Sequence, residues 1–121
     1  MSPRILFVDD EAPIRELLAL FFRKKGFEVS TSLNAHEARK FVETSTFDLA
    51  IVDVNLAGEN GLELLGFFKT SYPKMPVVIF TGMADDDDLV QKALRAGASG
   101  FMRKTESLES LYQEVRKHLP R

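Results

Sequence analysis

The sequence predicts an α/β fold in which a parallel sheet of five strands carries helices on both faces. Several short runs are apolar without polar alternation, as is typical of strands that are buried on both faces. Between these runs, apolar residues recur at helical spacing. The connections are short, and repeated strand–helix units of this kind form right-handed, doubly wound parallel sheets.

Five strands are expected, and three of them end directly at polar residues. One apolar run ends at Asp9, the most hydrophobic run ends at Asp53, and a third run ends at Thr81. The segment after Gly26 is a weaker strand candidate, and a last one leads toward Lys104. The predicted strands are residues 5–9, 27–31, 49–53, 77–81 and 99–102.

The expected helices follow each strand. The first begins near Ala12, because Pro13 suits a first helical turn, and it stops at Gly26. The others cover residues 35–42, about 62–71, 85–97 and 108–119. The fourth opens with four aspartates, residues 85–88, which we interpret as caps of the helix start and only second as an acidic docking patch.

Five strands in this arrangement favour the flavodoxin-like order 2-1-3-4-5, in which strands 1 and 3 are neighbours. Ligand sites of such sheets lie outside the carboxyl ends of the strands. Asp9, Asp10 and Asp53 are therefore expected side by side, although they are far apart in the sequence, with Thr81 and Lys104 at the same edge.

Composition limits the function further. The 121 residues suit one domain, residues 1–121, and the net charge of −2 gives no basic surface for nucleic acid. The absence of cysteine excludes disulfides and thiolate chemistry. No apolar run approaches the roughly 18 residues of a membrane span, and the start does not resemble a signal peptide. We expect a soluble, cytoplasmic protein with no membrane partner.

The acidic pair predicts a divalent cation site. Asp9 and Asp10, followed by Glu11, exceed what one helix cap needs, and neighbouring carboxylates repel one another unless a cation is present. Mg²⁺ prefers such oxygen ligands. The alternative is that these aspartates only cap the helix that begins near Ala12.

Asp53 beside a metal can act as a nucleophile and form an aspartyl phosphate, whereas alone it could be a turn residue. Thr81 can donate its hydroxyl to a phosphoryl oxygen, and Gly82 would let the backbone approach closely. Lys104 can pair with a phosphate as a point charge. Each signal alone has an ordinary structural explanation, and their convergence at one edge indicates phosphoryl chemistry.

In this order along the chain, these residues resemble the receiver domain of two-component response regulators, from Arg4 to about Leu119. The matching residues are Asp9-Asp10, Asp53, Thr81-Gly82, Lys104, Gly97-Ala98 and Phe101. The resemblance implies a phosphorelay function, in which Asp53 accepts a phosphoryl group from a sensor histidine kinase or a phosphotransfer protein. It implies no turnover of an external substrate, so the domain is not expected to be an enzyme.

The resemblance also implies roles for the other residues. Asp10, Asp53 and the backbone carbonyl of Asn55 would bind Mg²⁺, with Asp9 helping through water. Lys104 and Thr81 would bind the phosphoryl oxygens, and movement of Thr81 would let Phe101 turn inward as a switch. The face formed by residues 86–119 would contact an output domain or a partner protein. The resemblance is also compatible with homodimerisation that depends on phosphorylation.

The sequence departs from the family at several positions. The family usually has proline after the lysine, joined by a cis peptide, but Thr105 follows Lys104 here. Either a costly non-proline cis bond is kept or Lys104 is aimed differently. Ala57 replaces another usual proline, and Phe101 replaces a frequent tyrosine. Asn55 and Met83 stand where the family commonly tunes dephosphorylation.

Two rival functions remain at this point. One is an interaction-only receiver that docks partners without phosphorylation, which Thr105 favours. The other is a small Mg²⁺-dependent phosphohydrolase that uses Asp53 as its nucleophile. The sequence disfavours it, because no second acidic residue stands two positions after Asp53. A flavin or nucleotide site is disfavoured, because no glycine-rich loop follows the first strand.

Overall fold

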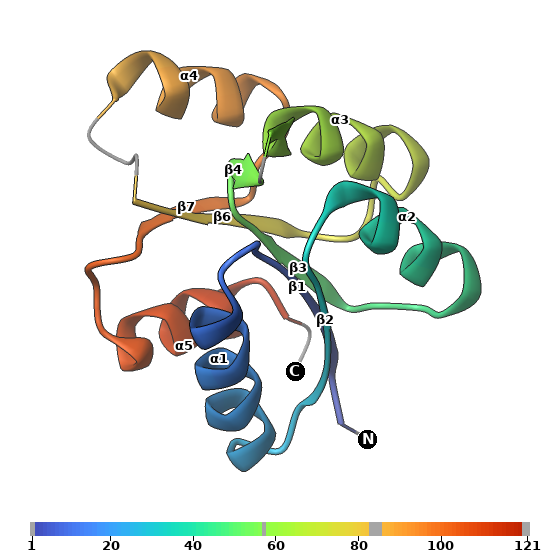
Figure 1. The fold of residues 1–121 in the computed structure, drawn as a ribbon, viewed down its shortest axis with the longest axis vertical. Helices are drawn as coiled ribbons and strands as arrows, with labels where there is room; N and C mark the ends of the chain where they lie inside the picture. The colour runs from blue at the N-terminus through green and yellow to red at the C-terminus, as the bar shows by residue number, and fades with distance from the viewer. Residues whose placement is uncertain (1, 57, 83–85, 120–121) are drawn as a thin grey trace.

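The computed structural model describes residues 2–56, 58–82 and 86–119. A parallel sheet of five strands forms its centre (Figure 1). The strands are β1 (Arg4–Val8), β2 (Glu28–Ser32), β3 (Leu49–Val52), β6 (Val77–Thr81) and β7 (Gly100–Arg103). Their order is β2-β1-β3-β6-β7, and every neighbouring pair is parallel. The predicted flavodoxin-like order 2-1-3-4-5 is confirmed.

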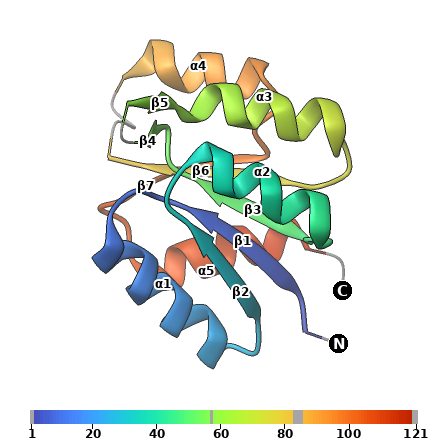
Figure 2. The same ribbon diagram turned by 45° about the vertical axis from the view of Figure 1, so that its right-hand side comes forward.

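Five helices cover the two faces of the sheet, as predicted. They are α1 (Ala12–Lys24), α2 (Ala35–Thr44), α3 (Gly61–Ser71), α4 (Asp87–Arg95) and α5 (Leu108–Lys117). Figures 1 and 2 show α1 and α5 on one face, and α2, α3 and α4 on the other. None of the helices in the described part of the chain is long and apolar enough to cross a membrane.

The core has two halves because the central strands bury both of their faces. In β1, Ile5 and Phe7 pack toward α1 and α5, while Leu6 and Val8 pack toward α2 and α3. All four are at most 1% exposed. Phe22 of α1 anchors the first half, and its ring contacts those of Phe21, Phe27 and Tyr112. Apolar runs without alternation thus produced doubly buried strands, as expected.

A short hairpin between β3 and α3 was not predicted. Its strands, β4 (Asn55–Leu56) and β5 (Glu59–Asn60), are antiparallel. Gly58 has a φ of +86°, in the left-handed region that glycine adopts without strain. The Glu59 carboxylate accepts a hydrogen bond from the Ala35 amide at 3.0 Å, so the hairpin is tied to the start of α2. A two-residue strand carries too little periodicity to be recognised in a sequence.

Several predicted boundaries shift by one or two residues. Asp9 and Asp53 lie immediately after β1 and β3 instead of within them, and α5 ends at Lys117, before Leu119. The capping interpretation of the aspartate run is confirmed at Asp86, whose side chain accepts a hydrogen bond from the Leu89 amide. Asp85 lies outside the described residues.

Candidate phosphoryl and metal site

The strand register brings the predicted site residues to one edge of the sheet. Val8 pairs with Val52, so Asp9 and Asp53 follow neighbouring strands at the same level. The Asp53 amide donates to the Val8 carbonyl at 3.0 Å, which locks this alignment. On the other side, Thr81 pairs with Arg103, and the Lys104 amide donates to the Thr81 carbonyl at 3.0 Å. The predicted convergence of these residues at the carboxyl ends is confirmed.

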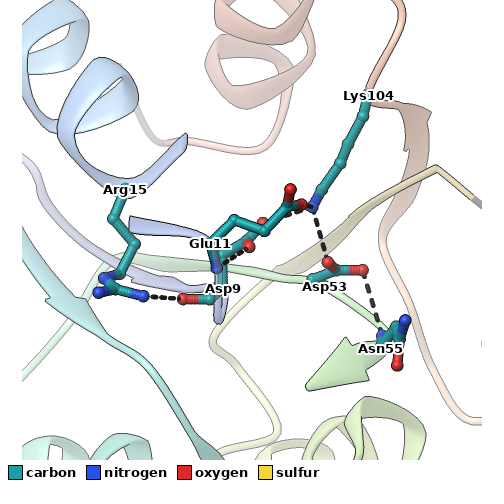
Figure 3. Close-up of polar contacts among 6 residues, drawn as sticks. All are labelled: Asp9, Glu11, Arg15, Asp53, Asn55 and Lys104. Carbon is teal, nitrogen blue, oxygen red and sulfur yellow. Dashed lines mark hydrogen bonds and ion pairs between the residues drawn. The ribbon is translucent and has the colours of Figure 1, made fainter. Parts of the chain in front are cut away.

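The Lys104 ammonium lies at the centre of the site (Figure 3). Its Nζ is 2.8 Å from Asp53 Oδ2, 2.8 Å from Asp9 Oδ2 and 2.6 Å from Glu11 Oε1. Burial alone would lower the pKa of this ammonium, but its bonds to the three carboxylates outweigh burial and raise the pKa above the ordinary lysine range. Lys104 is therefore a permanent cation in this arrangement.

Asp9 is the most deeply buried of the three carboxylates, with a side chain that is 0% exposed. Burial raises its pKa, and the contacts with Lys104 and with the Glu11 amide only partly oppose that rise. Asp9 Oδ1 accepts a hydrogen bond from the Glu11 amide at 2.9 Å. Oδ2 has only the ion pair with Lys104, and no well-directed hydrogen bond reaches it from the described residues. A buried carboxylate oxygen in this condition fits a cation ligand.

The helix-cap alternative for the acidic pair receives little support at Asp9. The residue at the N-cap of α1 is Glu11, and its side chain makes no capping hydrogen bond. Asp9 instead forms a local turn through the Glu11 amide. Asp10 is half-buried beside it and belongs to the same carboxylate group.

Four residues provide the donor set for a cation. One carboxylate oxygen from each of Asp9, Asp10, Glu11 and Asp53 lies within 4.8 Å of the others. Hard divalent cations such as Mg²⁺ prefer oxygen ligands of this kind. Asn55, on β4, is exposed, and its amide donates to Asp53 Oδ1 at 3.2 Å (Figure 3). The residues present thus fit an Mg²⁺ ion.

The two predicted switch residues occupy the same face of the sheet. Thr81 is buried at the end of β6, and Phe101 is half-buried on β7. Since Phe101 pairs with Ile79, two residues before Thr81, both side chains project toward the side of α4. This placement is compatible with a coupled movement, and the roles themselves remain predictions.

The departure at Thr105 has a structural answer. No peptide bond among the described residues is cis, yet Lys104 Nζ reaches Asp53 at 2.8 Å. The concern that Lys104 would be aimed elsewhere is therefore wrong. Ala57 and Met83 lie outside the described residues.

Sequence reasoning missed three residues that shape the site. Glu11 was noted only as an additional acid, but it pairs directly with Lys104. The Arg15 guanidinium, one turn along α1, donates to the Asp9 carbonyl at 2.7 Å. Gly61 begins α3 against the backbone of Asp53 and Val54. The contacts of Glu11 with Lys104 and of Arg15 with a backbone carbonyl leave no local pattern in the sequence by which they could have been found.

Comparison with known proteins places the chain in a family. Residues 5–116 match the model of the response regulator receiver domain. The chain is 34% identical over 112 residues to the response regulator protein PilR of Pseudomonas aeruginosa, and the match covers 93% of the chain and 25% of PilR. It is 30% identical over 120 residues to sporulation initiation phosphotransferase F of Bacillus subtilis, covering 99% and 96% respectively. The chain thus spans about a quarter of PilR's length and nearly all of the Bacillus protein.

Solved structures agree with this placement. The response regulator TrrA of Thermotoga maritima, solved in complex with Mg²⁺ and beryllofluoride, superposes with a TM-score of 0.86 at 32% identity, covering 98% of this chain and 100% of that one. A CheY-like receiver domain from Methanospirillum hungatei gives a TM-score of 0.90 at 29% identity, with 97% and 93% covered. This chain belongs to the response regulator receiver domain family of two-component phosphorelay signalling.

Proposed function

We propose that Asp53 is the phosphoacceptor of this receiver domain. The observation that carries the proposal is the pairing of a buried Asp53 carboxylate, 5% exposed, with the Lys104 ammonium at 2.8 Å. A carboxylate held beside a fixed cation and other metal-binding carboxylates can attack a phosphoryl group, because the charge that builds up is neutralised in place. The donor would be a phosphohistidine of a sensor kinase or a phosphotransfer protein.

The chemistry requires one bond to form and one to break. An Asp53 carboxylate oxygen attacks the phosphorus of the donor, and an acyl phosphate bond forms. The phosphorus–nitrogen bond of the phosphohistidine breaks, its electron pair goes to the imidazole, and the imidazole takes up a proton. Lys104 contributes positive charge to the phosphoryl oxygens, and Thr81 contributes its hydroxyl.

The metal would be held by Asp9, Asp10, Asp53 and the backbone carbonyl of Asn55. When bound, Mg²⁺ supplies charge neutralisation and orientation for the phosphoryl oxygens. The carboxylate oxygens within 4.8 Å of one another and the poorly satisfied Oδ2 of Asp9 support this assignment. The domain would act as a switch in the cytoplasm, without turnover of an external substrate.

The phosphoryl group would be read out through Thr81 and Phe101. Their common face lies beside α4, so an inward turn of Phe101 would change the surface formed by residues 86–119. That surface is where an output domain, a partner or a second receiver would dock. Two discrete positions of Phe101 would make it a two-state element biased by the phosphoryl group.

The test is the formation of an Asp53-dependent adduct. Purified protein is incubated with Mg²⁺ and acetyl phosphate, and intact-mass spectrometry measures the phosphorylated fraction. Wild type is expected to gain one phosphoryl group, and Asp53→Asn none. Asp48→Asn is the matched control, because Asp48 is an exposed aspartate before the opposite end of the same strand.

Two results would contradict the proposal. An unmodified wild type, which also fails to bind beryllofluoride, would favour the interaction-only receiver. Steady release of phosphate from unrelated phosphomonoesters, lost in Asp53→Asn, would favour the phosphohydrolase.

A further inference from the structure

Lys104 has as many carboxylate partners as an ammonium has N–H groups. Asp53, Asp9 and Glu11 each place one oxygen within 2.8 Å of Nζ. An ammonium donates three hydrogen bonds and accepts none. Two of the three oxygens, those of Asp53 and Glu11, accept hydrogen bonds from Nζ, and the third, from Asp9, forms an ion pair with it. A phosphoryl oxygen that approaches Lys104 therefore competes with carboxylates that already surround the ammonium.

Glu11 differs from the other two partners in its exposure. Its side chain is 58% exposed, whereas those of Asp9 and Asp53 are 0% and 5% exposed. A carboxylate that moves into water regains its hydration at little cost, but a buried carboxylate that loses Lys104 loses the positive charge that compensates its burial. Glu11 is the partner that can leave.

The backbone at Glu11 can stay in place while its side chain moves. The Glu11 amide is bonded to Asp9 Oδ1 at 2.9 Å, and its carbonyl accepts from the Arg15 amide at 3.1 Å. Because Glu11 is the N-cap of α1 and its side chain caps nothing, releasing that side chain breaks no helix contact. The hydrogen bond from Lys104 Nζ to the Glu11 carboxylate spans 93 positions of the sequence, so no local contact along α1 depends on it.

We propose that Glu11 is a releasable counter-ion of Lys104 that competes with the phosphoryl group and thereby sets the affinity of the site for it. Glu11 is in this sense a positioning residue, which holds Lys104 over Asp53 until the anion arrives. The inference rests on the proposed phosphoacceptor function of Asp53. The contact that breaks when the anion arrives is the Glu11–Lys104 pair.

The size of the effect follows from the geometry of the pair. Ion pairs with one exposed partner contribute little, and the corresponding change in a binding constant is about twofold to fivefold. At 2.6 Å, with the lysine side chain only 15% exposed, the pair belongs to the upper part of that range. Removing the Glu11 charge should tighten the binding of a phosphoryl mimic by this factor.

The experiment titrates beryllofluoride into the protein at saturating Mg²⁺ and measures affinity by calorimetry. Glu11→Gln is expected to bind the mimic about twofold to fivefold more tightly than wild type. Glu16→Gln is the matched control, since Glu16 is an exposed glutamate further along the same helix, and its affinity should equal that of wild type.

A third variant separates direct contact from simple charge repulsion. Glu11→Asp keeps the charge but is one methylene shorter, so it withdraws the carboxylate from Nζ. It should tighten binding as Glu11→Gln does if contact with Lys104 is the cause. Wild-type affinity in Glu11→Asp, with tighter binding only in Glu11→Gln, would mean repulsion and would overturn the inference.

Two further outcomes are decisive. Glu11→Gln with unchanged or weaker mimic binding, together with weaker binding of Mg²⁺ alone, would make Glu11 a metal ligand and refute its role as competitor. If wild type shows no Asp53-dependent beryllofluoride binding, the phosphoacceptor assignment itself fails. If wild type binds the mimic and Glu11→Gln binds it with the same affinity, the phosphoacceptor assignment stands and the role of Glu11 as competitor is refuted.

Discussion

Gly61 is the position where one methyl group should damage the site most directly. It begins α3, and its amide donates to the Val54 carbonyl at 2.7 Å. A Cβ placed there would lie 2.7 Å from Val54 Cα and 3.0 Å from the Asp53 carbonyl carbon, and closer still to the Asp53 carbonyl oxygen. All of these neighbours are backbone atoms, so no side chain can rotate away.

The Gly61→Ala substitution therefore forces the chain at Asp53 to move. Carbon atoms pack at about 3.5–4.0 Å, so relief of the clash needs a shift of about 1 Å. Overpacking of this kind costs about 1–3 kcal/mol of unfolding free energy. A displacement of about 1 Å at a reacting group can slow a reaction about 10²-fold, and Asp53 would be displaced relative to Lys104 by this amount.

The assay combines stability with phosphorylation. Urea unfolding measures the free energy of unfolding, and intact-mass spectrometry follows phosphorylation from acetyl phosphate with Mg²⁺ at a temperature where the variant is folded. Gly66→Ala is the matched control, because Gly66 lies within the same helix and a Cβ there meets nothing within 4 Å. It should gain roughly 0.5–1 kcal/mol and keep its rate.

The predicted clash is refuted if Gly61→Ala, like Gly66→Ala, loses no stability and keeps the wild-type rate. A loss of stability with the wild-type rate would show that the strain is absorbed in α3 and not at Asp53.

Three further predictions concern stability. Burial raises the pKa of Asp9 above its ordinary value of 3.8, so the folded state binds the proton more tightly than the unfolded state does. Without divalent cations, the wild-type stability should therefore fall as pH rises above 3.8. Asp9→Asn should be more stable than wild type at pH 7 in urea unfolding, and a less stable variant would contradict this. Burial pushes the pKa of Glu114 up, but its bonds to His118 and Lys117 outweigh burial and lower it. The stabilisation by Glu114 is therefore fully present above pH 4.5 and is lost as pH falls through the lowered pKa. Glu114→Gln should cost up to about 1 kcal/mol at pH 6, and this cost should shrink as the solution is acidified below pH 4.5. Phe22→Ala should cost about 3–5 kcal/mol, and a loss below 1 kcal/mol would mean that its ring cluster can collapse around the cavity.

The sequence alone determined the strand–helix order, the strand order of the sheet and the edge where the site lies. Strands that are buried on both faces need uninterrupted apolar runs, and parallel strands place all their carboxyl ends at one edge of the sheet. The sequence was therefore sufficient to assign four residues to that edge: Asp9, Asp53, Thr81 and Lys104.

Only the tertiary structure decided how these groups meet. A trans Lys104–Thr105 bond still allows Lys104 to reach Asp53, which depends on the whole path of the loop and not on one residue type. The pairing of Glu11 with Lys104 joins side chains from distant parts of the chain, and the clash at Gly61 depends on backbone contacts within a loop. Local sequence patterns encode burial and periodicity. Distances between side chains that are far apart in the sequence are set only when the strands pair and the helices pack on the sheet.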